Sequence, residues 1–172
     1  MYVSVLQEPR PLERRDDRSR FQSGNAELDD WFHRFAWQNH RAGNARVFVT
    51  TQEPETLGFY ALSMGAVQRS ILPDDLKPGQ RPEPCPVLLL ARLAVDQRAQ
   101  GRGIGAALLK DALLRAYRLS NEVGFAALLV HCANDQAREF YLSQSSQFVS
   151  CPGANNHLML PLRALQEFVN TL

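Results

Sequence analysis

Three glycines stand at alternate positions directly after an apolar segment of the sequence. Residues 88–96 are mostly apolar, and Gly101, Gly103 and Gly105 follow closely, with a run of helix-forming residues beginning near Ile104. Glycine has no Cβ, so successive backbone N–H groups can approach one point. The N-terminus of the following helix adds free N–H donors and the positive end of its dipole. This spacing predicts a site for a phosphate or pyrophosphate.

The turn departs from the two common nucleotide-binding motifs. A P-loop requires Lys and then Ser or Thr after its last glycine, and neither follows Gly105. A dinucleotide fingerprint requires a final glycine that is missing here. Gln100, Gly103 and Gly105 instead match the pattern [RQ]-x-x-G-x-[GA], which resembles the coenzyme A signature of the GNAT acyltransferases. For these six residues alone, a tight turn before a helix is an equally good interpretation.

Two further regions carry the same resemblance in the expected order. A strand-like segment at 125–132 leads into residues 134–141, where GNAT enzymes place Asn at the strand exit and Phe-Tyr in the next helix. The N-terminal third adds the segments 21–31 and 59–63. Together they resemble the acetyltransferase toxins of bacterial toxin–antitoxin modules, which acetylate the amino group of aminoacyl-tRNA. The resemblance covers residues 10–162.

The resemblance implies acetyl-CoA as co-substrate and gives residues their roles. Tyr141 is expected to be the catalytic acid that protonates the departing thiolate. The pantetheine arm is expected to pair with the backbone of residues 93–95, where an N–H group would polarise the thioester carbonyl. The pyrophosphate is expected in the turn at 100–106. The expected cofactor-binding residues are Leu93, Ala94, Val95, Gln100, Gly101, Arg102, Gly103, Ile104, Gly105, Ala106, Asn134 and Phe140.

One segment departs from the family pattern. The family runs from Phe-Tyr through three residues to Gly-Phe, whereas the segment from Tyr141 to Phe148 is two residues longer and lacks the glycine. Tyr141 stays in register with Asn134. We expect the last turn of this helix, and with it the wall of the acceptor site, to be reshaped.

Charge is distributed unevenly along a nearly neutral chain. The net charge is only +1, which argues against a general polyanion binder, and Lys77 and Lys110 are the only lysines among the 19 basic residues. GC-rich codon usage explains the arginine excess equally well, but the planar arginine fork is also the better phosphate ligand. Local arginine clusters can hold a tRNA acceptor stem through its phosphates. The candidate tRNA contacts are Arg34, Arg41, Arg46 and Arg92.

Size and composition fit one compact cytoplasmic enzyme. We expect a single GNAT domain over residues 1–172, with no membrane-spanning segment and no signal peptide. Three cysteines without metal-ligand spacing predict reduced thiols and no bound metal. As partners, the resemblance implies aminoacyl-tRNA and a ribbon–helix–helix antitoxin, and it leaves room for a homodimer.

The expected elements alternate between strands and helices. The periodicity predicts an α/β fold with the proline-rich segment 70–86 as a loop, and by itself it allows several α/β folds. The resemblance implies the GNAT fold, a mixed central sheet flanked by helices. Expected strands are 3–6, 46–51, 57–63, 87–96, 125–132 and 157–162, and expected helices are 26–42, 104–119, 135–144 and 163–172.

Two other functions stay open at this point. One is a GNAT enzyme that acetylates a small amine or a protein amine, although a cationic acceptor would favour acidic side chains rather than the Arg92 and 34–46 arginines. The other is a non-catalytic module that binds coenzyme A or a partner. The retained Gln100, Asn134 and Tyr141 argue against that module.

Overall fold

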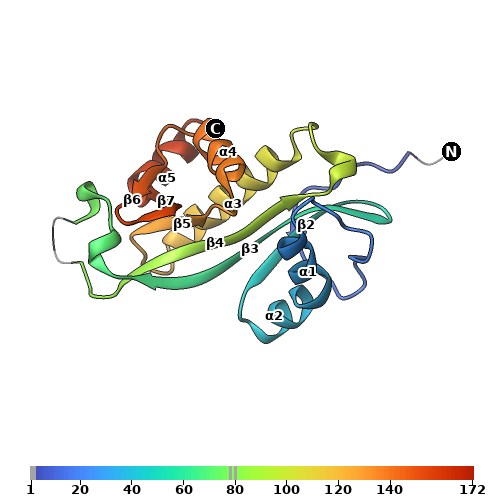
Figure 1. The fold of residues 1–172 in the computed structure, drawn as a ribbon, viewed down its shortest axis with the longest axis horizontal. Helices are drawn as coiled ribbons and strands as arrows, with labels where there is room; N and C mark the ends of the chain where they lie inside the picture. Colours follow the sequence, from blue (N-terminus) through green and yellow to red (C-terminus); the bar gives the residue numbers. More distant parts are fainter. Residues whose placement is uncertain (1–2, 78, 80) are drawn as a thin grey trace. The chain divides into compact units, whose positions relative to one another are not determined.

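Strands and helices alternate along the chain in the computed structural model, which describes residues 3–77, 79 and 81–172 (Figure 1). The strands are β1 (Arg10–Pro11), β2 (Arg46–Gln52), β3 (Glu55–Val67), β4 (Cys85–Val95), β5 (Ala127–His131), β6 (Val149–Cys151) and β7 (Ala154–Pro161). The helices are α1 (Ala26–Arg34), α2 (Ala36–Ala42), α3 (Ile104–Ser120), α4 (Asp135–Gln144) and α5 (Leu162–Asn170).

The strands pair in the order β1-β2-β3-β4-β5-β7-β6. The β4–β5 pair is parallel, whereas β1–β2, β2–β3, β5–β7 and β6–β7 are antiparallel. This mixed sheet with accompanying helices confirms the predicted α/β fold.

The chain divides into two compact units, and β3, β4 and α3 each contribute to both. Unit 1 takes the residues up to Ser63 together with Ala91–Ala112. Unit 2 takes Met64–Leu90 and Leu113–Leu172.

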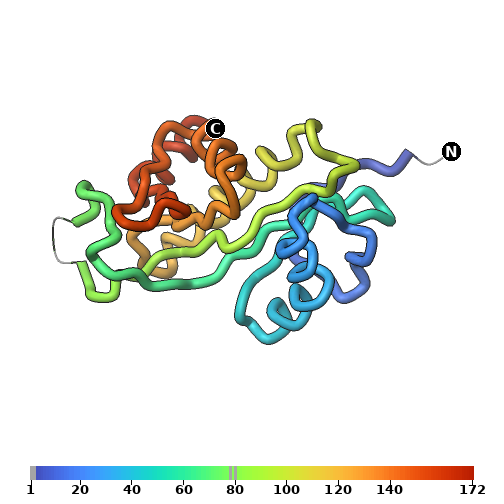
Figure 2. Tube along the Cα trace, viewed as in Figure 1, coloured from blue at the N-terminus to red at the C-terminus, as the bar shows by residue number. Residues whose placement is uncertain are grey.

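In unit 1, α1 and α2 lie against one face of β2 and β3 (Figures 1 and 2). Alternate strand residues point to opposite faces of a sheet, and one set meets the apolar side of α1. Asn25 caps α1, because its side-chain oxygen accepts from the N–H groups of Glu27 and Leu28 at 3.1 and 3.2 Å. The resulting buried cluster comprises Leu12, Phe21, Phe32, Ala36, Val47, Val49, Phe59, Ala61 and Ala94.

The first turns of α3 cover the opposite face in unit 1. Gly58 on β3 permits this close approach, since a Cβ there would stand 2.8 Å from Leu108 Cδ1. Tyr60, fully buried on the same face, donates a hydrogen bond to Asp111 on α3. Helix α3 is therefore held against the sheet by a residue beyond its first turn.

The predicted helix over 26–42 is wrong as a single element. It is interrupted at Phe35, whose backbone has φ −120° and ψ −18° and whose N–H bonds to the Trp31 carbonyl at 2.8 Å. Phe32 and Ala36 are both fully buried on either side of this break. Packing of two short helices on the sheet overrides the continuous helical periodicity.

The predicted strand at 3–6 is also wrong. Residues 3–9 make scattered hydrogen bonds, such as Gln7 N–H to the Thr51 carbonyl at 2.7 Å, and the first strand begins only at Arg10. Val3 and Val5 are exposed, so no buried face holds this segment in a ladder.

Unit 2 has its own buried cluster, made of Leu72, Leu76, Cys85, Val87, Ala126, Ala127, Leu129, Cys151 and Met159. The expected loop at 70–86 holds parts of two short 3-10 turns, Arg69–Ile71 and Asp74–Leu76, and its last residues begin β4; residues 78 and 80 of that loop lie outside the described part of the chain. The sequence interpretation missed β6 and placed the start of β7 at 157 instead of Ala154.

Candidate functional site

A glycine-rich turn joins β4 to α3 in unit 1, at the predicted cofactor position. Gly101 and Gly103 have φ angles of 81° and 80°, which only glycine adopts without strain. No atom of a non-neighbouring residue lies within 4 Å of where a Cβ would stand on either glycine. The Ala107 N–H bonds to the Gly103 carbonyl at 3.1 Å, so the N–H groups of residues 104–106 precede the helical ladder. Open space at these two glycines and free N–H donors at the start of α3 fit an anion such as a pyrophosphate.

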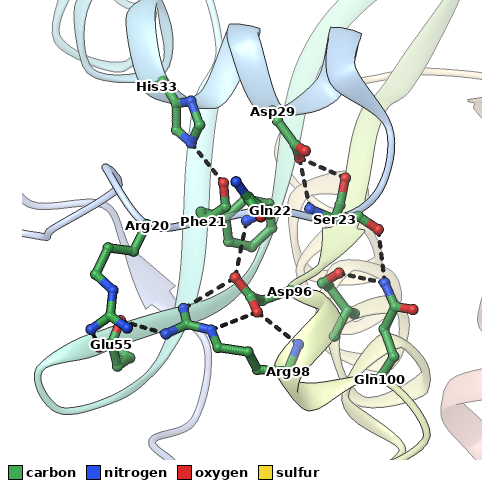
Figure 3. A network of polar contacts seen from close by, with 11 residues as sticks. Arg20, Phe21, Gln22, Ser23, Asp29, His33, Glu55, Asp96, Arg98 and Gln100 are labelled. Atoms are coloured by element: carbon green, nitrogen blue, oxygen red, sulfur yellow. Dashed lines mark hydrogen bonds and ion pairs between the residues drawn. The ribbon is translucent and has the colours of Figure 1, made fainter.

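Gln100 braces this turn from the side. Its amide nitrogen donates to the Ser23 carbonyl at 2.9 Å and to the Val95 carbonyl at 3.0 Å (Figure 3). One side chain thus joins the end of β4, the turn and the segment before α1. Gln100, the first residue of the glycine pattern, therefore holds the turn in place through its side chain.

Asp96 is a buried carboxylate that the sequence interpretation overlooked. It is 1% exposed and follows the last residue of β4. Its Oδ2 accepts from the Gln22 N–H at 3.0 Å, and its Oδ1 accepts from the N–H and Nε of Arg98, both at 2.8 Å. Burial alone would raise the pKa of Asp96, but the Arg98 and backbone hydrogen bonds outweigh it and lower that pKa. The sequence does contain a signal for this site, because an acid stands at the end of an apolar strand and Arg follows it two residues later.

The Asp96–Arg98 pair continues outward into a short ion-pair network. Arg98 lies 3.1 Å from Glu55 Oε2, and Arg20 lies 2.6 Å from Glu55 Oε1 (Figure 3). The side-chain hydrogen bonds to Asp96 and Glu55 raise the pKa of Arg98, so its charge is permanent. An open groove of about 390 Å³ lies beside the network, lined by Ser19, Arg20, Gln22, Asp96, Gln97 and Arg98.

The segment between these contacts is also fastened to α1. Asp29 Oδ1 accepts from the N–H and hydroxyl of Ser23 at 2.9 and 2.6 Å. His33 Nε2 lies 2.7 Å from the Phe21 carbonyl (Figure 3). Residues 21–23 therefore link α1 to the end of β4 and the turn.

The predicted pantetheine strand lies at the C-terminal end of β4. Ala94 is buried in the cluster under α1, while Leu93 and Val95 are half-buried and alternate with it along the strand. Arg102 in the turn is exposed and donates to Gln52 Oε1 at 3.2 Å.

The arginines of the 34–46 segment differ in their surroundings. Arg34 pairs with Asp30 at 3.3 Å and lies 5.1 Å over the Phe35 ring. Arg46 donates to the His40 carbonyl at 2.8 Å. Arg41 is exposed, and no ion pair is found for it within the described residues.

Arg92 has a different setting on β4. Its guanidinium carbon lies 4.2 Å from the centre of the Trp31 ring, a cation–π contact. The side chain is half-buried, and this burial lowers the pKa of Arg92. Trp31 is thus a platform for a cation and also packs against the buried aromatic cluster through Phe59.

Tyr141, the predicted acid, lies on α4 in unit 2. It is 4% exposed, with its ring 5.2 Å from Phe140 and 5.9 Å from Phe148 between centroids. Burial, with a smaller contribution from Cys132, raises the pKa of Tyr141. The hydroxyl therefore keeps its proton at neutral pH, as a proton donor requires.

Asn134 and residues 141–148, the segment that differs from the family pattern, also belong to unit 2. Asn134 caps α4, its side-chain oxygen accepting from the Ala137 N–H at 2.8 Å. Helix α4 ends at Gln144, and Ser145 N–H bonds to the Tyr141 carbonyl at 3.3 Å. Although this connection is longer than in the family pattern, the Phe148 ring still lies beside the Tyr141 ring.

The predicted site residues fall into two groups. The strand, turn and arginine candidates all lie in unit 1, whereas Asn134, Phe140 and Tyr141 lie in unit 2. Across the described residues there is no cluster of three metal-ligating side chains, and Cys85, Cys132 and Cys151 are buried and free. No helix in the described part of the chain is long and apolar enough to cross a membrane.

Comparisons with known proteins identify the family of this chain. The family model "Acetyltransferase (GNAT) domain" matches residues 43–144. The "tRNA-acetylating toxin" of Mycobacterium tuberculosis is 41% identical over 167 residues, covering 97% of this chain and 99% of the relative. The structure of AtaT complexed with acetyl-methionyl-tRNAfMet has a TM-score of 0.85 and 27% identity, covering 96% of this chain and 99% of AtaT. A mutant AtaT toxin bound to the C-terminus of the antitoxin AtaR and acetyl-CoA has a TM-score of 0.79 and 25% identity, covering 96% and 99%. The predicted resemblance is confirmed, and the chain belongs to the GNAT family of acetyltransferases.

Proposed function

We propose that this chain is an acetyltransferase toxin that transfers the acetyl group of acetyl-CoA to the α-amino group of aminoacyl-tRNA and so blocks translation. The observation that carries the proposal is the 41% identity to a tRNA-acetylating toxin along 97% of the chain. Residues 1–172 act as one GNAT domain in this proposal, since β3, β4 and α3 each run through both units.

The turn and the end of β4 provide groups for the co-substrate. Acetyl-CoA supplies an activated acetyl thioester. The N–H groups of residues 101–106 hold the pyrophosphate, and the backbone of residues 93–95 pairs with the pantetheine amides. The open space at Gly101 and Gly103 supports this assignment, because side chains there would fill it. Asn134 and Phe140 complete the cofactor-binding set by family resemblance.

The chemistry needs a proton donor more than a base. A free α-amino group titrates near 7.7–8.0, and an adjacent ester lowers that value, so much of the amine is a neutral nucleophile. The amine nitrogen bonds to the carbonyl carbon as the carbon–sulfur bond breaks. Tyr141 donates its proton to the departing sulfur, a water removes the extra proton from nitrogen, and a proton from solvent returns to the Tyr141 oxygen. The Tyr141 hydroxyl is protonated at neutral pH, because burial raises its pKa, and its assignment as the acid rests on the family resemblance.

Arginines supply the contacts to RNA. Arg34, Arg41, Arg46 and Arg92 all lie in unit 1, and unlike Arg98 none of them pairs with a buried carboxylate in the part of the chain that the structure describes. Phosphate contacts of this kind make binding salt-dependent. Few such contacts are needed, so a net charge of +1 is compatible with them.

A toxin of this class acts in the cytoplasm and is held in check by an antitoxin. AtaT, the structural relative, has been solved with the C-terminus of its antitoxin AtaR. For this chain we propose an antitoxin with a ribbon–helix–helix domain, and a homodimer as its solution state. Light scattering and co-expression with the neighbouring reading frame test both points.

The direct test is acetylation of aminoacyl-tRNA by purified protein. We expect radiolabelled acetate to pass from acetyl-CoA to the amino acid, and mass spectrometry after nuclease digestion to identify N-acetylaminoacyl adenosine. The matched control is Gly103→Glu, which places a strained, negatively charged side chain where the pyrophosphate would bind. It should abolish transfer and acetyl-CoA binding together.

Two results would overturn the proposal in different directions. Acetylation of polyamines or protein N-termini, with none of aminoacyl-tRNA, would point to an amine acceptor of another class. Acetyl-CoA binding without transfer to any acceptor would point to a non-catalytic module.

Expression of the chain alone in bacteria should arrest growth and leave acetylated aminoacyl-tRNA in extracts.

A further inference from the structure

Arg92 stands at the end of an aromatic column in unit 1. Its guanidinium lies 4.2 Å from the Trp31 ring. The Trp31 ring is stacked with Phe59 at 6.1 Å between centroids, and Phe59 is stacked with Phe32 at 4.1 Å. Phe32 and Phe59 are fully buried, so the column is rooted in the core. The orientation of Arg92 is therefore set by packing.

The charge of Arg92 has no carboxylate in contact. Arg10, Arg20 and Arg98 each pair with Asp or Glu within 3 Å, but no ion pair involves Arg92 among the described residues. Glu27 is the acid that acts on Arg92 electrostatically. Partial burial of a cation without a counter-ion is costly. An external anion is the ligand that would offset this cost.

The position of Arg92 indicates which anion. It directly precedes residues 93–95, where pantetheine is proposed to lie, and it shares with Ala94 the face of β4 that meets α1. Among the amine acceptors considered, an aminoacyl ester on RNA is the one that brings a phosphodiester close to its reacting amine. A planar guanidinium stacked on an aromatic ring presents its N–H fork to such a group.

We propose that Arg92, oriented by Trp31, binds a phosphodiester near the 3′ end of the acceptor RNA; this inference rests on the proposed function. Arg92 is the ligand, and Trp31 is a positioning residue. The Arg92–Trp31 pair would thus favour RNA acceptors over small amines and protein N-termini, which carry no phosphate near the reacting amine.

The test measures RNA binding and catalysis separately. Deacylated tRNA is titrated by fluorescence anisotropy at several salt concentrations, and acetyl-CoA by calorimetry. Arg92→Gln should weaken tRNA binding about tenfold. It should also lower the slope of log affinity against log salt by about 0.7–0.9. The affinity for acetyl-CoA should stay at the wild-type value, while the KM for aminoacyl-tRNA rises.

Three further variants separate positioning from charge and fold. Arg92→Lys keeps the charge but loses the planar fork, so its tRNA affinity should fall between wild type and Arg92→Gln. Trp31→Leu removes the platform and should weaken tRNA binding, and Trp31→Phe should restore most of it. Arg15→Gln removes an exposed arginine already paired with Glu13 and should bind tRNA as wild type does.

The outcomes distinguish this inference from the proposed function. If wild type acetylates aminoacyl-tRNA but Arg92→Gln keeps its tRNA affinity and salt slope, the phosphodiester site is wrong and the proposed function stands. If Arg92→Gln loses acetyl-CoA affinity instead, Arg92 serves the cofactor phosphates. If wild type binds no tRNA, the inference is wrong whichever amine is acetylated.

Discussion

Tyr141 combines a buried ring with a hydroxyl that keeps its proton, and its role can be tested by removing one atom. Tyr141→Phe preserves the ring contacts to Phe140 and Phe148. Loss of a general acid costs about 10²–10⁴ in rate. We expect kcat for aminoacyl-tRNA to fall within that range while the affinity for acetyl-CoA is unchanged. Tyr117→Phe, which removes a hydroxyl on α3, is the control, and wild-type turnover in Tyr141→Phe would exclude Tyr141 from the mechanism.

The pH dependence of kcat gives a second measurement of the same residue. Because the pKa of Tyr141 is raised above the ordinary tyrosine value of about 10, the protonated form persists through mildly alkaline solution. We expect no loss of kcat from this group between pH 7 and 10. A decline in that range that disappears in Tyr141→Phe would show that Tyr141 loses its proton below pH 10, which would contradict the raised pKa while identifying Tyr141 as the acid.

At the scale of elements, the contacts of Asp96 set where the cofactor turn begins. Asp96→Asn replaces a carboxylate oxygen by an NH₂ donor, which would face either the Gln22 N–H or the Arg98 donors. We expect the free energy of unfolding to fall by about 1.5–3 kcal/mol. The affinity for acetyl-CoA should fall about tenfold because the turn loses its fixed start.

The control for Asp96 is an aspartate without this setting. Asp17 is exposed and bonds only locally to Ser19, so Asp17→Asn should leave the affinity for acetyl-CoA unchanged. At saturating acetyl-CoA, Asp96→Asn should recover most of its kcat, since no reacting atom is lost. An Asp96→Asn protein that binds acetyl-CoA normally would show that the turn holds its shape without this carboxylate.

At the scale of the whole molecule, a pair of histidines makes stability depend on pH. His131 on β5 is paired in register with His157 on β7, and their rings lie 4.1 Å apart. Both ring nitrogens of His157 are buried and have no hydrogen-bond partner among the described residues, and burial lowers the pKa of His157. His157 therefore binds a proton less readily in the folded chain than in the unfolded chain.

The sign of the effect follows from linkage. The contribution is fully present above the unfolded-state pKa of about 6.5 and is lost progressively as the pH falls toward the lower folded-state pKa. One proton gives a slope of up to about 1.4 kcal/mol per pH unit. Urea unfolding of wild type between pH 7.5 and 5 should show this loss, and His157→Phe should reduce it. Equal slopes for the two proteins would exclude His157 as the cause.

Features that depend only on neighbouring residues could be predicted from the amino-acid sequence. The glycine turn was predictable because positive φ angles at Gly101 and Gly103 demand that residue type, whatever surrounds them. Helices α3 and α4 were predictable from periodicity. Asn134 was expected only as a cofactor residue by resemblance, whereas the structure makes it the cap of α4.

Contacts between residues that are distant in the sequence could be identified only in the folded chain. Asp96 meets Gln22 across 74 positions, and Arg92 meets Trp31 across the chain from β4 to α1. The break at Phe35 and the His131–His157 pair also arise from packing and strand register. Residue types and local spacing carry no information about these meetings, because burial and contact depend on how the elements pack. For the same reason, only the folded chain distinguishes Arg92, seated on an aromatic ring, from an arginine such as Arg34 that is paired within its own helix.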